Sequence, residues 1–189
     1  MKNAGSRMTL PNMLTIVRIV LVPVYMFLAL RGTIGTDWAA FLAFLLASIT
    51  DKLDGYLARK NNQITSFGKI MDPLADKLLV TAALLVFLQQ GRIGVAPVTI
   101  IIAREFAVSS LRVVAMGEGK LMAAGWSGKL KTAAQMVVIC VMLGLPLLGL
   151  PLPLMIEQIL GWALALITLW SGIDYFWSNR SLIKTGIDK

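Results

Sequence analysis

Long apolar stretches, several of them ending in charged residues, place the strongest constraint on how this chain folds. A helix needs roughly 20 apolar residues to cross a bilayer core of about 30 Å. Of all residues, 57% are apolar and only 15% are charged, whereas a soluble domain is about half apolar and a quarter charged. We therefore predict an all-α integral membrane protein with six transmembrane helices after a short N-terminal interfacial segment, forming one domain over residues 1–189. The expected spans are approximately 12–31, 38–60, 69–90, 94–116, 125–149 and 153–177.

The second, third and fourth expected spans reach membrane-crossing length only if their charged ends are also helical. Charged side chains on spanning helices are costly and usually face a protein-lined cavity. These charges lie at the end of the second span, the start of the third, the end of the fourth and the start of the fifth. In an up-and-down bundle all four ends share one side of the membrane. The sequence therefore predicts a polar cavity that opens to one face.

The distribution of basic residues predicts which face that is. With the N-terminus in the cytoplasm, most Lys and Arg residues lie on the cytoplasmic side, and only Arg31 and Arg92 lie on the other, as the positive-inside rule requires. An even number of spans then places both termini, and the cavity, on the cytoplasmic side. The excess of 18 basic over 10 acidic residues favours anionic lipid head groups or phosphorylated substrates over nucleic acid.

Two missing residue types exclude several chemistries. The chain has no histidine, which excludes a Ser-His-Asp triad, histidine-liganded zinc and histidine-held haem. Its one cysteine, Cys140, lies in an apolar run and can form neither an intrachain disulfide nor a cysteine-rich metal site. Catalytic groups must therefore come from Asp, Glu, Lys, Arg, Ser, Thr, Tyr or the backbone.

Four aspartates form the most informative cluster. Asp51 and Asp54 are one turn apart at the end of the second expected span, and Asp72 and Asp76 are one turn apart at the start of the third. The short polar linker 60–67 predicts a helical hairpin that brings the two pairs together. Carboxylates this close repel one another strongly unless they are protonated or held by cations.

Carboxylates without histidine or cysteine select hard divalent ions such as Mg²⁺, Mn²⁺ or Ca²⁺. Four of them suit a two-metal site, and such sites commonly serve displacement at phosphorus. Two other interpretations compete with this one. The aspartates could form ion pairs with neighbouring Lys and Arg residues in a solvated hairpin, or they could mark a cation or proton path through a transporter.

The residues of this hairpin also match a family signature. They are, in order, Asp51, Asp54, Gly55, Ala58, Arg59, Gly68, Asp72 and Asp76. At this spacing they resemble the signature of the CDP-alcohol phosphatidyltransferases, and every fixed position is present. The resemblance covers essentially the whole chain and implies transfer of a phosphatidyl group from a CDP-linked lipid to an alcohol, with release of CMP.

The resemblance also implies roles for individual residues. Asp51, Asp54 and Asp72 would bind divalent metal, with two Mg²⁺ ions per site and Mn²⁺ as the alternative. Asp76 would contribute to the second metal and act as the general base that takes the proton of the acceptor hydroxyl. The CDP-lipid would be lined by Asn12, Thr15, Gly55, Ala58, Arg59, Thr65 and Gly68, of which Asn12 is equally a helix N-cap.

A second cluster bears on the identity of the acceptor alcohol. Arg104 and Arg112 lie two turns apart in the fourth expected span, and Lys129 and Lys131 begin the fifth. Arginine forks and lysine charges favour phosphate oxygens, so the pattern predicts an acceptor that carries its own phosphate. An ion pair between Arg104 and Glu105 is the competing interpretation.

The residues around this cluster resemble the phosphatidylglycerophosphate synthase branch of the family. That resemblance implies sn-glycerol 3-phosphate as the acceptor, CDP-diacylglycerol and membrane lipids as partners, a homodimer, and a bacterial-type inner membrane with the active site facing the cytoplasm. The alternatives are a related transferase that uses an inositol phosphate or serine, a cation or proton transporter, and a structural membrane protein.

Overall fold

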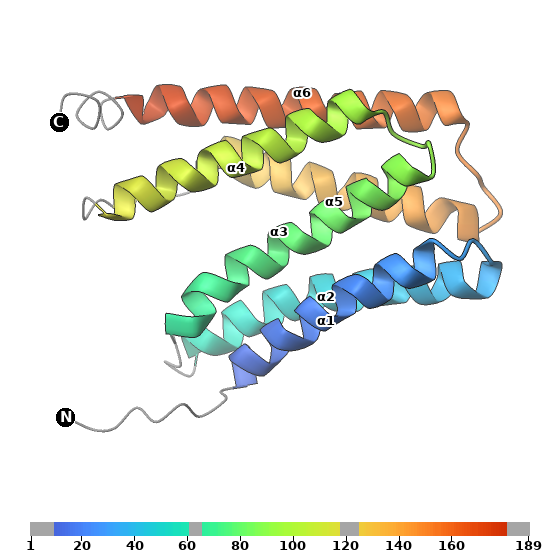
Figure 1. Ribbon diagram of the computed structural model, residues 1–189, viewed down its shortest axis with the longest axis horizontal. Coiled ribbons are helices and arrows are strands. Elements are labelled where there is room, and N and C mark those ends of the chain that lie inside the picture. Colours follow the sequence, from blue (N-terminus) through green and yellow to red (C-terminus); the bar gives the residue numbers. More distant parts are fainter. Residues whose placement is uncertain (1–9, 61–65, 118–124, 181–189) are drawn as a thin grey trace. The chain divides into compact units, whose positions relative to one another are not determined.

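The computed structural model describes the backbone of residues 10–60, 66–117 and 125–180. Within these ranges it describes all side chains except those of residues 10, 11, 51–60, 66–70 and 73. The described chain forms six helices and contains no strand (Figure 1). They are α1 (Leu10–Ala29), α2 (Ile34–Lys60), α3 (Ser66–Gln89), α4 (Val95–Gly117), α5 (Trp126–Leu147) and α6 (Leu154–Ser178). The all-helical prediction is confirmed, and each helix begins and ends within a few residues of an expected span.

The helices differ in how well they suit a membrane. Among the described residues, three segments are long and apolar enough to cross a bilayer: Asn12–Ala29, Trp126–Leu147 and Leu154–Ser178. The other three helices are α2, α3 and α4, the ones whose charged ends the sequence analysis noted. This composition is that of a membrane protein.

The contacts divide the chain into two compact units, which we call the N-terminal unit (residues 1–86) and the C-terminal unit (residues 87–189). The N-terminal unit contains α1, α2 and most of α3, and the C-terminal unit contains the end of α3 together with α4, α5 and α6. A single domain over the whole chain stays a prediction.

In the N-terminal unit, α1 packs along α2. The small residues Ala40, Ala43 and Ala47 of α2 are buried at helical spacing, which permits a close approach between helices. Phe44 on the same face meets Tyr25 of α1, with ring centroids 5.7 Å apart. This packing forms the core of the unit.

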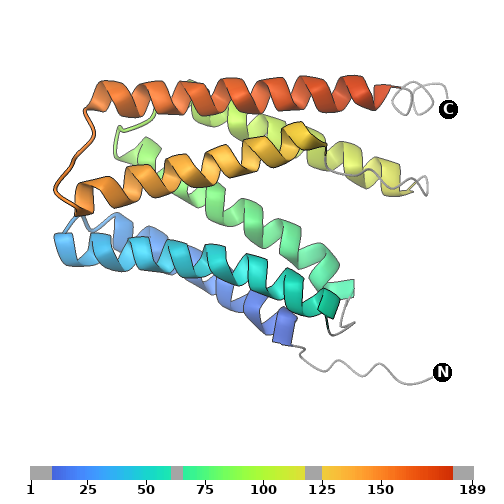
Figure 2. The same ribbon diagram turned by 180° about the vertical axis from the view of Figure 1, so that it is seen from behind.

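In the C-terminal unit, α4 and α5 both pack against α6. The opposite views in Figures 1 and 2 show them on different sides of it. Two glycines of α6 permit close contacts with α4 and with the turn before it, since a Cβ atom at Gly161 would lie 2.7 Å from Ile93 and one at Gly172 would lie 2.9 Å from Arg104. Any larger residue at either position would push the neighbouring chain away.

An ion pair between half-buried Arg92 and buried Glu157 holds the turn before α4. Arg92 lies in the turn between α3 and α4, next to Gly91 with its φ of 71°. Its Nε and Nη2 atoms donate to Oε1 of Glu157 on α6 at 2.8 and 2.5 Å. Nη2 also donates to the carbonyl oxygen of Met142 on α5 at 2.6 Å. A single side chain thus connects the turn with both neighbouring helices.

Candidate active site

The described part of the carboxylate cluster lies on α3. Asp72 and Asp76 are one turn apart and half-buried, so their carboxylates share one side of the helix. The hydroxyl of Thr15 on α1 donates to Oδ1 of Asp72 at 2.6 Å, and Thr15 itself is fully buried. Oδ2 of Asp72 has no hydrogen-bond partner among the described residues. The bond fixes one oxygen of the Asp72 carboxylate.

Thr15 and Asp72, predicted to belong to one site, are therefore in contact. Asp51, Asp54, Gly55, Ala58 and Arg59 lie on α2, and Gly68 lies on α3, but the side chains of these positions are outside the described set. Thr65 lies outside the described residues altogether. The meeting of the two aspartate pairs stays a prediction.

The donor atoms of this site suit a hard metal ion. Asp72 and Asp76 supply two of the four predicted carboxylates. The one cysteine of the chain, Cys140, is half-buried on α5 and belongs to the C-terminal unit. Among the described side chains no group of three candidate metal ligands occurs, but that set leaves out Asp51 and Asp54. Oxygen donors of this kind fit Mg²⁺ or Mn²⁺.

Arg18 of α1 is a further polar residue with no predicted role. Arg18 is fully buried and lies one turn after Thr15, on the same side of the helix. A buried arginine inside an apolar span is costly and marks a functional region by default. Its position in an otherwise apolar run was the signal that could have identified it.

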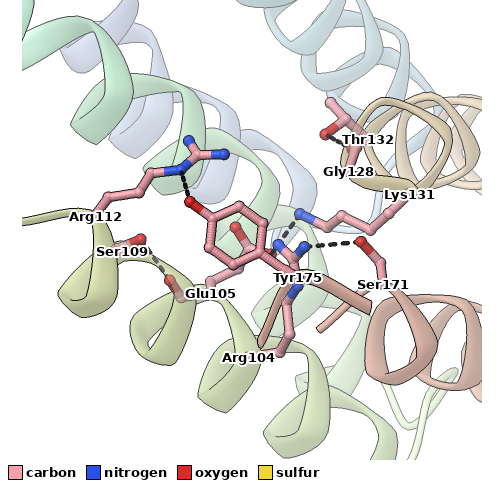
Figure 3. A network of polar contacts seen from close by, with 9 residues as sticks. All are labelled: Arg104, Glu105, Ser109, Arg112, Gly128, Lys131, Thr132, Ser171 and Tyr175. Atoms are coloured by element: carbon pink, nitrogen blue, oxygen red, sulfur yellow. Dashed lines mark hydrogen bonds and ion pairs between the residues drawn. The ribbon is translucent and has the colours of Figure 1, made fainter. Parts of the chain in front are cut away.

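The predicted acceptor cluster forms a network in the C-terminal unit (Figure 3). Glu105 of α4 is at its centre, because its Oε1 atom lies 2.5 Å from Nζ of Lys131 on α5 and 3.0 Å from Nη1 of Arg104. Nη2 of Arg104 donates to the hydroxyl of Ser171 on α6 at 2.8 Å. The network therefore joins all three helices. It also contains the Arg104–Glu105 ion pair that the sequence left as the competing interpretation.

Arg112 has a different environment. Its Nε atom donates to the hydroxyl of Tyr175 on α6 at 3.1 Å, and its guanidinium carbon lies 5.4 Å from the centroid of that ring. Tyr175 is buried, and Arg112 is half-buried. The fourth predicted cation, Lys129, is exposed at the start of α5. Two of the four cations thus share a carboxylate, whereas the other two have no carboxylate partner in the described part of the chain.

Polar residues continue from this network into the interior of the C-terminal unit. On α5, Ser127, Lys131 and Gln135 are buried at spacings of one helical turn. On α6, Thr168 and Ser171 are fully buried in the same way. Among the described residues, Nε2 of Gln135 and Oγ1 of Thr168 have no hydrogen-bond partner. Buried polar groups without partners destabilise a fold, and none of the described residues offsets this cost at these two atoms.

Sequence reasoning missed the α6 side of this cluster. Ser171 and Tyr175 carry no charge and lie in a strongly apolar helix, so their residue types alone gave little signal. Asp174 was also missed, and it accepts a hydrogen bond from Ser127 at 2.5 Å. The helical spacing of Thr168, Ser171 and Tyr175 could have revealed a polar side of α6.

Comparison with known proteins gives a consistent result. A protein of Bacillus subtilis strain 168 named CDP-diacylglycerol–glycerol-3-phosphate 3-phosphatidyltransferase is 40% identical over 191 residues, which cover 93% of this chain and 97% of that protein. Proteins with the same name from Rickettsia typhi and Shigella flexneri serotype 5b are 40% and 34% identical, over 88% and 91% of this chain and 94% and 95% of their own lengths. Residues 8–170 match the CDP-alcohol phosphatidyltransferase family. The chain therefore belongs to the CDP-alcohol phosphatidyltransferase family.

Proposed function

We propose that this protein transfers the phosphatidyl group from CDP-diacylglycerol to sn-glycerol 3-phosphate, giving phosphatidylglycerophosphate and CMP. The observation that carries the proposal is the alignment over about nine-tenths of the chain with proteins from several bacteria that are named for this reaction. The fixed Asp72 carboxylate, with Asp76 one turn away, supports the chemistry. Family membership favours this reaction over transport.

Asp76 is proposed as the general base. Its carboxylate takes the proton of the acceptor hydroxyl, whose oxygen forms a bond to the lipid-side phosphorus while the bond from that phosphorus to the CMP oxygen breaks. CMP leaves with the electron pair. Thr15 contributes by holding Asp72 in one orientation, and the other predicted residues of the CDP-lipid pocket contribute by binding the nucleotide.

The family is generally dependent on a divalent metal ion. We propose that Asp51, Asp54, Asp72 and Asp76 hold two Mg²⁺ ions, with Mn²⁺ as the alternative. When bound, these ions would neutralise the negative charge of the pyrophosphate and of the transition state. The chain's own part is to place the carboxylates, and the bond from Thr15 to Asp72 performs this for one of them.

The acceptor phosphate is proposed to bind at Arg104, Arg112, Lys129 and Lys131. The contacts divide these four residues into two pairs. Arg104 and Lys131 share Glu105, whereas Arg112 and Lys129 have no carboxylate partner among the described residues. We therefore propose that Arg112 and Lys129 make the first contact with the phosphate.

The remaining proposals concern topology and assembly. The positions of the helices support six spans with both termini in the cytoplasm. The names and bacterial sources of the relatives support a bacterial inner membrane, with the active site on the cytoplasmic side. The resemblance to the family is the basis for a homodimer.

The test is CMP release by purified protein in detergent with CDP-diacylglycerol and Mg²⁺. Glycerol 3-phosphate, inositol 1-phosphate, serine or no acceptor would be supplied in turn. We expect release with glycerol 3-phosphate only, and loss of release with EDTA or in an Asp76→Asn variant. Release with a different acceptor would overturn the acceptor assignment, and no release by folded protein would overturn the enzyme assignment.

A further inference from the structure

Two arginines of α4 use opposite ends of their guanidinium groups. Arg104 uses Nη1 for Glu105 and Nη2 for Ser171, and its buried Nε has no partner among the described residues. Arg112 uses Nε for the hydroxyl of Tyr175, and its Nη atoms make no hydrogen bond to the described part of the chain. The Nη atoms of Arg104 are therefore held by two protein groups, whereas those of Arg112 are held by none of the described residues.

The two arginines also differ in their net charge environment. The carboxylate of Glu105 compensates the charge of Arg104. Tyr175 is neutral, so it accepts a hydrogen bond from Arg112 and packs its ring near the guanidinium without cancelling the charge. An arginine that is oriented and has no carboxylate partner among the described residues suits a phosphate dianion, which binds the two Nη atoms side by side.

Orientation matters because a long arginine side chain loses much rotamer freedom when it binds a ligand. Tyr175 is only 5% exposed and belongs to the buried face of α6. Figure 3 shows its hydroxyl directed at Arg112, while Arg104 and Lys131 converge near Glu105. A buried ring held by a helix is a rigid support that restricts Arg112 before any ligand arrives.

We propose that Tyr175 is a positioning residue for the acceptor phosphate, acting through Arg112. This rests on the proposed function and adds a residue to it. The hydroxyl of Tyr175 holds Nε of Arg112, the ring supports the guanidinium plane, and the two Nη atoms then face the phosphate of the acceptor. Tyr175 thus favours phosphorylated alcohols over phosphate-free ones without touching the substrate.

The first test is a Tyr175→Phe variant, which keeps the ring and removes the hydrogen-bond acceptor. We expect the KM for glycerol 3-phosphate to rise about 3- to 10-fold, the range that one hydrogen bond supports. The kcat and the KM for CDP-diacylglycerol should stay within about 2-fold. Tyr25→Phe is the matched control, because Tyr25 is a buried tyrosine of the N-terminal unit that packs on Phe44, and it should leave the acceptor KM unchanged.

The second test is a double-mutant cycle with Arg112→Lys, which keeps the positive charge and removes the guanidinium group with its two Nη atoms. In the Arg112→Lys background, Tyr175→Phe should change the acceptor KM by less than about 2-fold, since the Nε atom that the Tyr175 hydroxyl holds is absent. Three outcomes would overturn the proposal. The acceptor KM could be unchanged in Tyr175→Phe, the KM values of both substrates could rise equally, or the two substitutions could have additive effects in the cycle. Failure of the proposed function is distinct, because the unmodified protein would then release no CMP with glycerol 3-phosphate.

Discussion

Two ionic clusters occur among the described residues of the C-terminal unit, and they differ in their net charge. At Arg92 and Glu157, one arginine bonds one carboxylate twice and one backbone carbonyl. At Glu105, one carboxylate holds two cations, and Nε of the partner Arg104 has no bond to the described residues. The first cluster is nearly neutral, whereas the second has an excess of positive charge.

This difference separates structure from function. An ion pair of equal and opposite charges has no net charge to attract an ionic ligand, and the removal of one partner leaves a charge without compensation. A buried cluster with excess charge destabilises the fold unless another interaction compensates for it. We infer that Arg92–Glu157 stabilises the helix connections and that the Glu105 cluster prepares a site for an anion.

The largest expected effect is on the free energy of unfolding, from a change at the Arg92–Glu157 ion pair. A Glu157→Gln change removes the charge that both Nε and Nη2 of Arg92 contact, and should lower the free energy of unfolding by about 3 kcal/mol. Unfolding in mixed detergent micelles would measure it. The KM for glycerol 3-phosphate should not change in the fraction that remains folded, and a selective rise in that KM would contradict the structural assignment.

The matched change at the other cluster is Glu105→Gln. It should lower the free energy of unfolding by about 2 kcal/mol, because hydrogen bonds to charged groups are lost while Arg104 keeps Ser171. Arg104 and Lys131 then repel each other without their shared carboxylate, so the acceptor KM should rise at least about 3-fold. Steady-state kinetics would show this, and a fall in KM would mean that Glu105 competes with the acceptor.

A smaller effect is expected at Ser171. Replacing it with Ala removes the hydroxyl that receives Nη2 of Arg104, which should lower the free energy of unfolding by about 1 kcal/mol. Unfolding of the single variant and of Ser171→Ala combined with Glu105→Gln would measure the coupling. Strictly additive losses would show that the two contacts of Arg104 act independently and that the network is not one unit.

The smallest expected effect has the opposite sign. Thr168→Val replaces a buried hydroxyl that lacks a partner among the described residues with a methyl group of similar size. If the hydroxyl is unsatisfied in the resting protein, the variant should gain about 1 kcal/mol of unfolding free energy. A loss of stability instead would mean that Thr168 is satisfied by bound water, and the comparison between the two clusters would lose part of its support.

The sequence by itself determined the helices and the chemical class of the site. Apolar runs and their charged ends are local features, and they predicted all six helices to within a few residues. The aspartate spacing is equally local, because one helical turn sets which side chains share a face. It led to the family that the comparisons confirmed. Whether Asp51 and Asp54 meet Asp72 and Asp76 stays a prediction.

The tertiary structure alone decided how the cations divide. In the sequence, Arg104 already had the adjacent Glu105 as a competing partner, but nothing distinguished Arg112 from Lys131. The hydrogen bonds of the two arginines are made with residues far along the chain: Ser171 is 67 residues from Arg104, and Tyr175 is 63 residues from Arg112. Helix packing on α6 creates these contacts, and neither composition nor periodicity encodes which side chain meets which. In the N-terminal unit, a contact between α1 and α3 likewise joins Thr15 to Asp72 across 57 residues.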